Sequence, residues 1–411
     1  MNENYEKAII LEPLLDGENH AEKIEEIESL LLATSCEHFL TVTQKIREIN
    51  PSTFLGTGKL DELKEVIEQN EVNLVVFDGE LSPSQVNNIS DRLDVKVITR
   101  TTLILDIFAQ HALSPEGKIL VELAQLKYLY PRLQGKGIKL SRLGGGIGTR
   151  GPGETKLETD RRHIKTRIKY LERNIKEIEK RRKMQQNRRE RNGVKTVCLV
   201  GYTNTGKSTL LNLLCNSDVL AKDQLFATLD PTARKTVFNG HPLIIMDTVG
   251  FVKNLPPDLI EAFKSTLECA VYADLILNVC DISANFEMQI ETTKKTLADL
   301  GATSEIITVA NKCDKIKDFE DIPKNFTLIS AKNNLGIEEL KNVICEKLFQ
   351  DVIKGSITLD YSKKYNLTKI KSVCQSIELS YNDDGTTIKY LVEEKNYQKL
   401  MEYFNEIKNG E

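Results

Sequence analysis

The sequence predicts a protein of several α/β domains, and three observations support this prediction. Short apolar runs alternate with helical patterns over the first hundred residues and again over residues 197–349, which is typical of parallel strands joined by helices. A helix-rich region with coiled-coil spacing separates these two parts. The chain of 411 residues is long enough for two to four domains of ordinary size.

The composition excludes several classes of protein. Hydrophobic residues make up 40% and charged residues 28% of the chain, which excludes collagen-like, mucin-like and wholly disordered chains. No run approaches the roughly 18 apolar residues of a membrane span, and the start MNENYEKAII has acids where a signal peptide has bases. The eight cysteines and five histidines are dispersed, without zinc-like spacing. We expect a cytoplasmic chain with reduced cysteines and no stable membrane association.

One segment is strongly basic, although the whole chain has a net charge of −4. Residues 127–195 contain 22 Lys/Arg against 7 Asp/Glu, whereas the rest contains 34 against 53. Such a concentration of positive charge is typical of a nucleic-acid contact. The alternative interpretations are a helix laced with ion pairs and a surface for anionic membranes.

Residues 1–112 are expected to form an N-terminal α/β domain with an open, largely parallel sheet. Helical patterns near residues 21–33, 59–69 and 83–93 alternate with strand-like runs. These runs are Ala8–Leu11, Phe39–Val42, Leu74–Phe77 and Val95–Ile98.

Residues 113–193 are expected to form a helical coiled-coil hairpin. Two helical stretches each carry one apolar stripe at steps of three and four. An antiparallel pair, in which each helix buries the stripe of the other, satisfies both patterns. The stripes are Ile119, Leu123, Leu126 and Tyr130, then Leu157, Ile164, Ile168, Leu171, Ile175 and Ile178.

Residues 134–153 lie between these helices and contain eight glycines. Because glycine weakens both helix and strand, we expect a loop at the tip of the hairpin. Its cations Lys136, Lys139, Arg142 and Arg150 are candidate contacts to RNA phosphates. A linker between domains is the alternative, but a linker needs neither a hairpin beneath it nor interleaved cations.

Residues 194–352 begin with a motif for phosphate binding. The run Val197–Val200 leads into a full GxxxxGK[ST] phosphate loop, and a helix follows. We expect backbone N–H groups of the loop to face nucleotide phosphates, Lys207 to neutralise the β and γ phosphates, and Ser208 to bind Mg²⁺. The loop consists of Gly201, Tyr202, Thr203, Asn204, Thr205, Gly206, Lys207 and Ser208.

Three further motifs follow, each after an apolar run. Asp247 is expected to hold Mg²⁺ through water, and Gly250 to sense the γ phosphate. Asp314 is expected to accept hydrogen bonds from N1 and the N2 amine of guanine, and since adenine lacks that amine, the region is predicted to be a P-loop GTPase domain. The last motif should offer a backbone N–H to guanine O6. The motifs are Asp247-Thr248-Val249-Gly250, Asn311-Lys312-Cys313-Asp314 and Ser330-Ala331-Lys332.

The segment that senses the γ phosphate is expected before Asp247. The candidate is Phe226-Ala227-Thr228-Leu229-Asp230-Pro231-Thr232, in which Thr228 or Thr232 would bind Mg²⁺. Phe251 stands after Gly250, where Ras-like enzymes have the glutamine that orients water. No residue is therefore assigned as catalytic, although Lys207, Thr228 and Gly250 support hydrolysis. We predict slow unaided hydrolysis that a partner such as rRNA stimulates.

Residues 353–411 are expected to form a small C-terminal α+β domain. The runs Ile377–Tyr381 and Thr387–Val392 flank Asn382-Asp383-Asp384-Gly385 and predict a β-hairpin. A helical pattern follows at Tyr397–Ile407. The segment carries no recognisable chemistry, so an accessory or docking role is the simplest interpretation.

The motifs together resemble the HflX family of GTPases. The resemblance rests on Leu105–Gln110, VELAQLKYLYPRL at residues 121–133, GGGIGTRGPGETKLETDRR at residues 144–162, the phosphate loop and FATLDPTAR. It covers essentially the whole chain and is most specific over residues 100–260. It implies the four domains described above, with GTP-dependent binding to the large ribosomal subunit.

The resemblance also implies a role for the predicted tip loop and the nucleotide. The loop would reach the peptidyl-transferase region of 23S rRNA in the 50S subunit, and the GTP form would split stalled or idle 70S ribosomes under stress. Thr228 is favoured over Thr232 as the second Mg²⁺ ligand beside Ser208. GTP or GDP would contact residues 201–208, 226–230, 247–250, 311–314 and 330–332. Nothing in the sequence demands more than a monomer off the ribosome.

Two other functions remain open at this point. A large-subunit assembly GTPase would use the same motifs but leave once the particle matures. A tRNA-modifying or membrane-associated GTPase is disfavoured, because the tRNA-modifying relatives end with a catalytic cysteine and the last cysteine here is Cys374.

Overall fold

The computed structural model describes residues 6–14, 20–34, 36–133, 152–191, 194–215, 232–251, 267–318 and 322–409. The chain divides into two compact units, and each is described by itself. Among the described residues, the first contains those up to 179 and the second contains those from 180 onward.

The first unit begins with the predicted parallel sheet, in the order β2-β1-β3-β4. Its strands are β1 (Lys7–Leu14), β2 (Glu37–Lys45), β3 (Leu74–Phe77) and β4 (Lys96–Thr99), and every pair is parallel. The helices are α1 (His20–Leu32), α2 (Thr57–Asn70), α3 (Pro83–Leu93) and α4 (Arg100–His111). Apolar side chains from the central strands, such as Ile9 and Phe77, are fully buried against them. The open α/β prediction for this part of the chain is confirmed.

A buried charge cluster lies at the carboxyl end of β1 and β3. The Arg100 guanidinium contacts Asp78 at 2.9 Å and Glu26 at 2.7 Å. Glu12 is fully buried, and its burial beside Asp78 raises its pKa to about 9. The neutral form of Glu12 is therefore favoured, beside the ion pairs that Arg100 makes with Asp78 and Glu26. In open α/β sheets this edge commonly binds ligands, but here the protein's own side chains pack into it.

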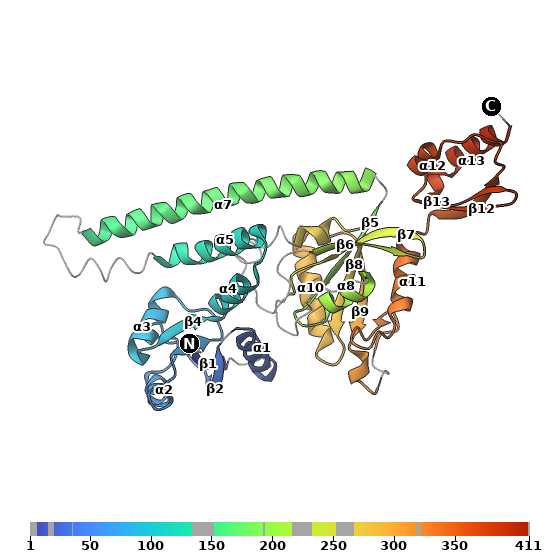
Figure 1. Ribbon diagram of the computed structural model, residues 1–411. Coiled ribbons are helices and arrows are strands. Elements are labelled where there is room, and N and C mark those ends of the chain that lie inside the picture. The colour runs from blue at the N-terminus through green and yellow to red at the C-terminus, as the bar shows by residue number, and fades with distance from the viewer. Residues whose placement is uncertain are drawn as a thin grey trace, which may run out of the picture. The chain divides into compact units, whose positions relative to one another are not determined.

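Two long helices follow and lie side by side as the predicted antiparallel hairpin (Figure 1). They are α5 (Pro115–Arg132) and α7 (Pro152–Arg191). Arg167 makes a two-point ion pair with Glu122, at 2.6 and 2.8 Å, and the Arg161 guanidinium lies 5.4 Å from the ring centroid of Tyr130. Leu171 of the apolar stripe is buried. The predicted tip loop, residues 134–153, lies outside the described residues from position 134 to 151, and its last two residues belong to α7 instead.

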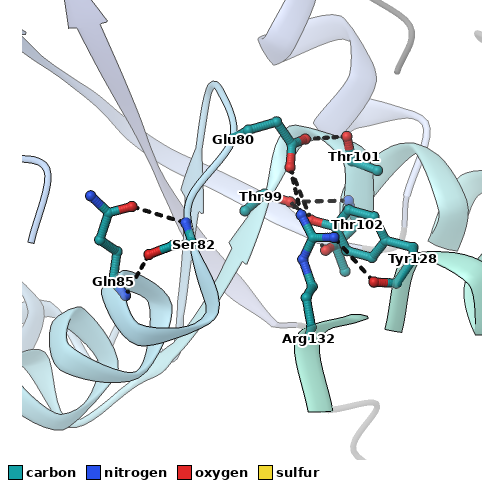
Figure 2. A network of polar contacts seen from close by, with 8 residues as sticks. All are labelled: Glu80, Ser82, Gln85, Thr99, Thr101, Thr102, Tyr128 and Arg132. Carbon is teal, nitrogen blue, oxygen red and sulfur yellow. Dashed lines mark hydrogen bonds and ion pairs between the residues drawn. The ribbon is translucent and has the colours of Figure 1, made fainter. Parts of the chain in front are cut away.

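A polar network fastens the end of α5 to the α/β sheet (Figure 2). The Tyr128 hydroxyl is 2.7 Å from the Thr99 hydroxyl, and Arg132 donates to Glu80 at 3.0 Å. Thr101 also donates to Glu80, and the Arg132 guanidinium stacks 3.4 Å from the Tyr128 ring centroid. The last turn of α5, directly before the tip loop, is therefore held by the N-terminal domain.

The second unit contains a six-stranded sheet in the order β10-β9-β8-β5-β7-β6. All neighbours are parallel except β6 and β7. Its core lies between the sheet and two helices and includes Leu199, Leu210, Leu277 and Ile344. The elements are β5 (Lys195–Gly201), α8 (Lys207–Cys215), β6 (Thr232–Phe238), β7 (His241–Asp247), β8 (Leu275–Asp281), α10 (Phe286–Leu300), β9 (Glu305–Asn311), η2 (Cys313–Lys315), β10 (Thr327–Leu328) and α11 (Ile337–Leu348).

The chain ends with a three-stranded antiparallel sheet in the order β11-β13-β12. The predicted hairpin is β12 (Ser376–Asn382) with β13 (Gly385–Glu393), and the predicted helix lies within α13 (Glu394–Asn409). β11 (Val352–Leu359) and α12 (Leu367–Val373) complete this part. Ile388, Val392, Leu400 and Phe404 are buried between the sheet and helices.

Candidate nucleotide site

The motifs predicted from the sequence meet at one edge of the six-stranded sheet. The four central strands of this sheet, β7, β5, β8 and β9, all run in the same direction. Their carboxyl ends therefore lie at the same edge. The phosphate loop follows β5, Asp247 ends β7 and Asn311 ends β9. This is the edge at which α/β sheets bind nucleotides.

The phosphate loop has glycines where the backbone comes too close for a side chain. A Cβ on Gly201 would lie 2.1 Å from the Val279 carbonyl oxygen. A Cβ on Gly206 would lie 2.3 Å from Nδ2 of Asn311, and its φ of +91° is one that other residues rarely adopt. The loop therefore packs directly against β8 and against the guanine motif.

Lys207 is buried under this loop, at the start of α8. Its ammonium donates to the carbonyl oxygens of Gly201 and Tyr202, at 3.1 and 2.7 Å. Burial lowers the pKa of Lys207 to about 8, although Asp247 favours the charged form. A Cβ on Gly250 would lie 2.9 Å from the Lys207 ammonium. Lys207 and Gly250 are thus placed together, as the γ-phosphate roles predicted for both require.

Nucleotide affinity is expected to fall as the pH rises through 8. Phosphates favour the charged form of Lys207, so binding above its free pKa of about 8 must take up a proton. This linkage weakens GDP binding about tenfold between pH 7 and pH 9. Titration calorimetry at pH 8, in two buffers with different ionisation enthalpies, should show uptake of about half a proton per GDP. Binding without proton uptake would mean that Lys207 does not meet the phosphates or that it is already charged in the free protein.

Two side-chain oxygens of the kind that Mg²⁺ prefers meet beside Lys207. The Ser208 hydroxyl donates to Oδ2 of Asp247 at 2.7 Å, and the Thr248 amide donates to Oδ1 at 2.9 Å. Hydroxyl and carboxylate oxygens suit this cation, so both side chains fit the predicted metal position. The remaining predicted ligand, Thr228, lies outside the described residues with the rest of the segment 226–230.

Phe251 has a role that the sequence did not indicate. Its side chain is buried, and its backbone pairs with the phosphate loop. The Phe251 N–H donates to the Gly201 carbonyl at 3.0 Å, and its carbonyl accepts from the Thr203 N–H at 2.8 Å. Phe251 therefore joins the Asp247–Gly250 motif to the phosphate loop. A phenylalanine has no side-chain group that could orient a water molecule, in keeping with the slow hydrolysis predicted above.

The guanine end of the site is built around Asn311, which is almost fully buried. Its Nδ2 donates to the Thr205 carbonyl at 2.7 Å, and its Oδ1 accepts from the Ala331 N–H at 2.9 Å. Asp314 is exposed, and a hydrogen bond from Ser330 is the main cause that lowers its pKa. One side chain thus ties the phosphate loop, the Asn311–Asp314 motif and the Ser330–Lys332 motif together, leaving the Asp314 carboxylate charged and accessible.

The structure brings together the predicted residues 201–208, 247–250, 311–314 and 330–332. The predicted rRNA contacts Lys136, Lys139, Arg142 and Arg150 lie outside the described residues. Within the described part of the chain, no group of three or more His, Cys, Asp or Glu side chains could hold a metal ion. No helix in that part is long and apolar enough to cross a membrane.

Three family models match consecutive parts of the chain. A model described as GTP-binding GTPase N-terminal matches residues 21–109, and one described as GTP-binding GTPase middle region matches residues 111–189. A third, described as 50S ribosome-binding GTPase, matches residues 196–312. The third match contains the phosphate loop and ends within the guanine motif.

Several relatives named GTPase HflX are similar over most of their length. The relative from Caldanaerobacter subterraneus is 46% identical over 387 residues, which cover 93% of this chain and 90% of the relative. The relative from Escherichia coli K12 is 40% identical over 365 residues, which cover 86% and 85%.

A crystal structure of a GTP-binding protein from Sulfolobus solfataricus in complex with GDP is similar over 84% of this chain and 99% of that chain. Its TM-score is 0.45 and its sequence identity is 24%.

Proposed function

The chain belongs to the GTPase HflX family, and on that premise we propose that its GTP form binds the large ribosomal subunit and splits stalled or idle 70S ribosomes. The protein is a GTPase, and the described motifs supply the binding edge for GTP and GDP. The ribosome would place this activity in the cytoplasm, with stress rescue and recycling as its use.

The observation that carries the proposal is the basic hairpin. From residue 127 onward it falls within the segment that has 22 Lys/Arg against 7 Asp/Glu, and α5 and α7 lie side by side with Leu171 of the apolar stripe buried. Among the described residues, the outer face of α7 presents several exposed cations to an anionic partner. Exposed cations on this face include Arg162, Lys165, Lys169, Arg173 and Lys176. Phosphate groups of rRNA are opposite in charge to such a surface.

The anchoring of α5 supports a role for the tip loop. Arg132 and Tyr128 fix the last turn of α5 to Glu80 and Thr99, and the predicted tip loop starts at residue 134. Its cations Lys136, Lys139, Arg142 and Arg150 would contact 23S rRNA near the peptidyl-transferase region. A loop on a fixed base loses less conformational freedom on binding than one on a free helix end.

The nucleotide would set the affinity for the ribosome. We propose that Ser208 and Thr228 bind Mg²⁺, with Asp247 holding it through water, and that the bound metal neutralises phosphate charge. A nucleotide can shift ribosome binding only by its differential affinity for two forms of the protein. Hydrolysis would then return the protein to the weakly bound form. Because Phe251 cannot orient water, the unaided rate would be slow, and the ribosome would stimulate it.

Sedimentation of purified 70S ribosomes through sucrose gradients tests the proposal. With this protein and a non-hydrolysable GTP analogue, we expect 70S particles to convert to 30S and 50S, with the protein in the 50S fraction. GDP in place of the analogue, and a Lys207→Ala variant with the analogue, should leave the 70S peak intact. Binding to 50S without loss of 70S would support the assembly GTPase instead. Absence from both fractions would assign the basic hairpin to another anionic partner.

A further inference from the structure

We propose that Asp281 is a positioning residue for guanine-nucleotide binding, because it holds Lys312 of the Asn311–Asp314 motif against the phosphate loop. Asp281 belongs to none of the motifs that the sequence identified. It ends β8, the strand next to β9, and its register partner on β9 is Asn311. The two strand ends are also joined by a hydrogen bond from the Ile282 N–H to the Asn311 carbonyl, at 3.0 Å.

The carboxylate of Asp281 forms a short ion pair with Lys312. Its Oδ2 lies 2.6 Å from the Lys312 ammonium, and the two side chains are only 14% and 21% exposed. The same ammonium donates to the Asn204 carbonyl of the phosphate loop at 2.8 Å. Solvent screens a partly buried ion pair less than a surface pair. The Asp281 carboxylate therefore restrains the position of the Lys312 ammonium.

A restraint on the Lys312 side chain matters because the Lys312 backbone is in an uncommon conformation. Its φ of 65° and ψ of 32° fall in the left-handed region, which lysine rarely adopts without support from its surroundings. The residue is followed by the short helix η2, which carries Asp314. The ion pair at one end of the Lys312 side chain therefore helps to define the backbone from which the base-reading carboxylate projects.

Asp281 is itself held in place from two sides. Its other oxygen, Oδ1, accepts from the Ser283 N–H at 3.0 Å and the Ser283 hydroxyl at 2.6 Å. The Asp281 N–H donates to Gln289 of α10 at 2.9 Å, and Gln289 is buried. The carboxylate is thus preorganised, so it positions Lys312 without first having to be ordered.

This arrangement gives the guanine motif two fastenings to adjacent residues of the loop. Asn311 donates to the Thr205 carbonyl, and Lys312 donates to the Asn204 carbonyl. Only the second depends on a carboxylate. Removing that carboxylate should leave the phosphate contacts of the loop unchanged. It should make the Asn311–Asp314 motif, which contacts the base, less rigidly held. Removal of the carboxylate should therefore weaken GDP and GTP binding by the same factor. The weakening should come from faster dissociation of the nucleotide.

Stopped-flow release of a fluorescent GDP analogue from the Asp281→Asn variant tests the inference. We expect dissociation about tenfold faster than in the native protein, which corresponds to about 1.4 kcal/mol, with the association rate nearly unchanged. A fluorescent, non-hydrolysable GTP analogue should show the same factor. Asp299→Asn is the matched control, because it removes the same charge from an exposed position on α10 and should leave dissociation unchanged.

A double-mutant cycle separates positioning from a general effect on the fold. Lys312→Met removes the ammonium but keeps an unbranched side chain, so Asp281→Asn should add almost nothing in that background. An equal acceleration with and without Lys312 would overturn the proposal and leave Asp281 as a support for the Ser283 turn. Unchanged dissociation in the single variant would overturn it as well. If the native protein itself did not prefer guanine, the fault would lie with the assignment of Asp314 and not with Asp281.

Discussion

Replacement of Asp314 by asparagine is expected to change the base preference of the protein from guanine to xanthine. Guanine offers two donors, the N1 hydrogen and the N2 amine, and the Asp314 carboxylate can accept from both. An asparagine amide can accept from N1 but presents its NH₂ group to the N2 amine, so two donors face each other. Xanthine has a carbonyl at that position and can accept from the amide.

The expected size of this effect is about a hundredfold loss of GTP affinity, with a gain of similar size for xanthosine triphosphate. Sites that pair with a specific polar group reject analogues lacking it by even larger factors. Competition of both nucleotides against a fluorescent GDP analogue measures the two affinities. Asp314 is exposed, so the variant should unfold at the same temperature as the native protein. A variant that still prefers GTP would show that another residue reads the base.

The sequence predicted most of the elements that form the nucleotide edge, because the signals there are local. Each motif follows a buried apolar run, and a run such as Val197–Val200 can hardly be anything but a central strand. The hairpin was also predictable, since its apolar stripe has the spacing that two helices need. The apolar run before the Ser330–Lys332 motif covers residues 326–329, but the strand within it, β10, has only Thr327–Leu328. A short strand at the edge of a sheet pairs on one side only, so its length depends on its neighbour.

Contacts between strand ends were beyond the reach of the sequence. The Asp281–Lys312 pair and the backbone pairing of Phe251 both depend on which strands are neighbours and in which register. Neither apolar periodicity nor motif spacing contains that information. The same reason explains why β11 was missed. It pairs with β13 across α12 and β12, and its alternation alone, VIKGSITL, does not distinguish it from a linker.

The buried cluster around Arg100 is a further case. Nothing in the local sequence sets Glu12 apart from the many exposed glutamates of this acidic chain. Only the fold places Glu12 beside Asp78 and raises its pKa. The network at Glu80 likewise joins the loop after β3 to α4 through Thr101 and to α5 through Tyr128 and Arg132 (Figure 2). Contacts between polar side chains that are distant in the sequence are therefore the least predictable part of the fold.

The simultaneous replacement of Lys136, Lys139, Arg142 and Arg150 by alanine is expected to weaken binding to the 50S subunit by up to about a thousandfold at 0.1 M salt. Each phosphate contact releases roughly 0.7 to 0.9 of a counterion when it forms. Loss of four contacts should therefore reduce the slope of log affinity against log salt by about three. Filter binding or sedimentation of the GTP form, over a range of potassium concentrations, measures both quantities.

Two controls decide whether such a loss belongs to the tip. The affinity of the variant for GDP should equal that of the native protein, because the loop is separate in sequence from every nucleotide motif. Replacement of Lys294 and Lys295 by alanine tests whether loss of positive charge elsewhere on the surface has the same effect, because both are exposed on α10. This change should leave the slope of log affinity against log salt nearly unchanged. An unaltered slope in the fourfold variant would mean that the glycine-rich segment is a linker. The exposed cations of α7 would then have to provide the whole electrostatic attraction to the ribosome.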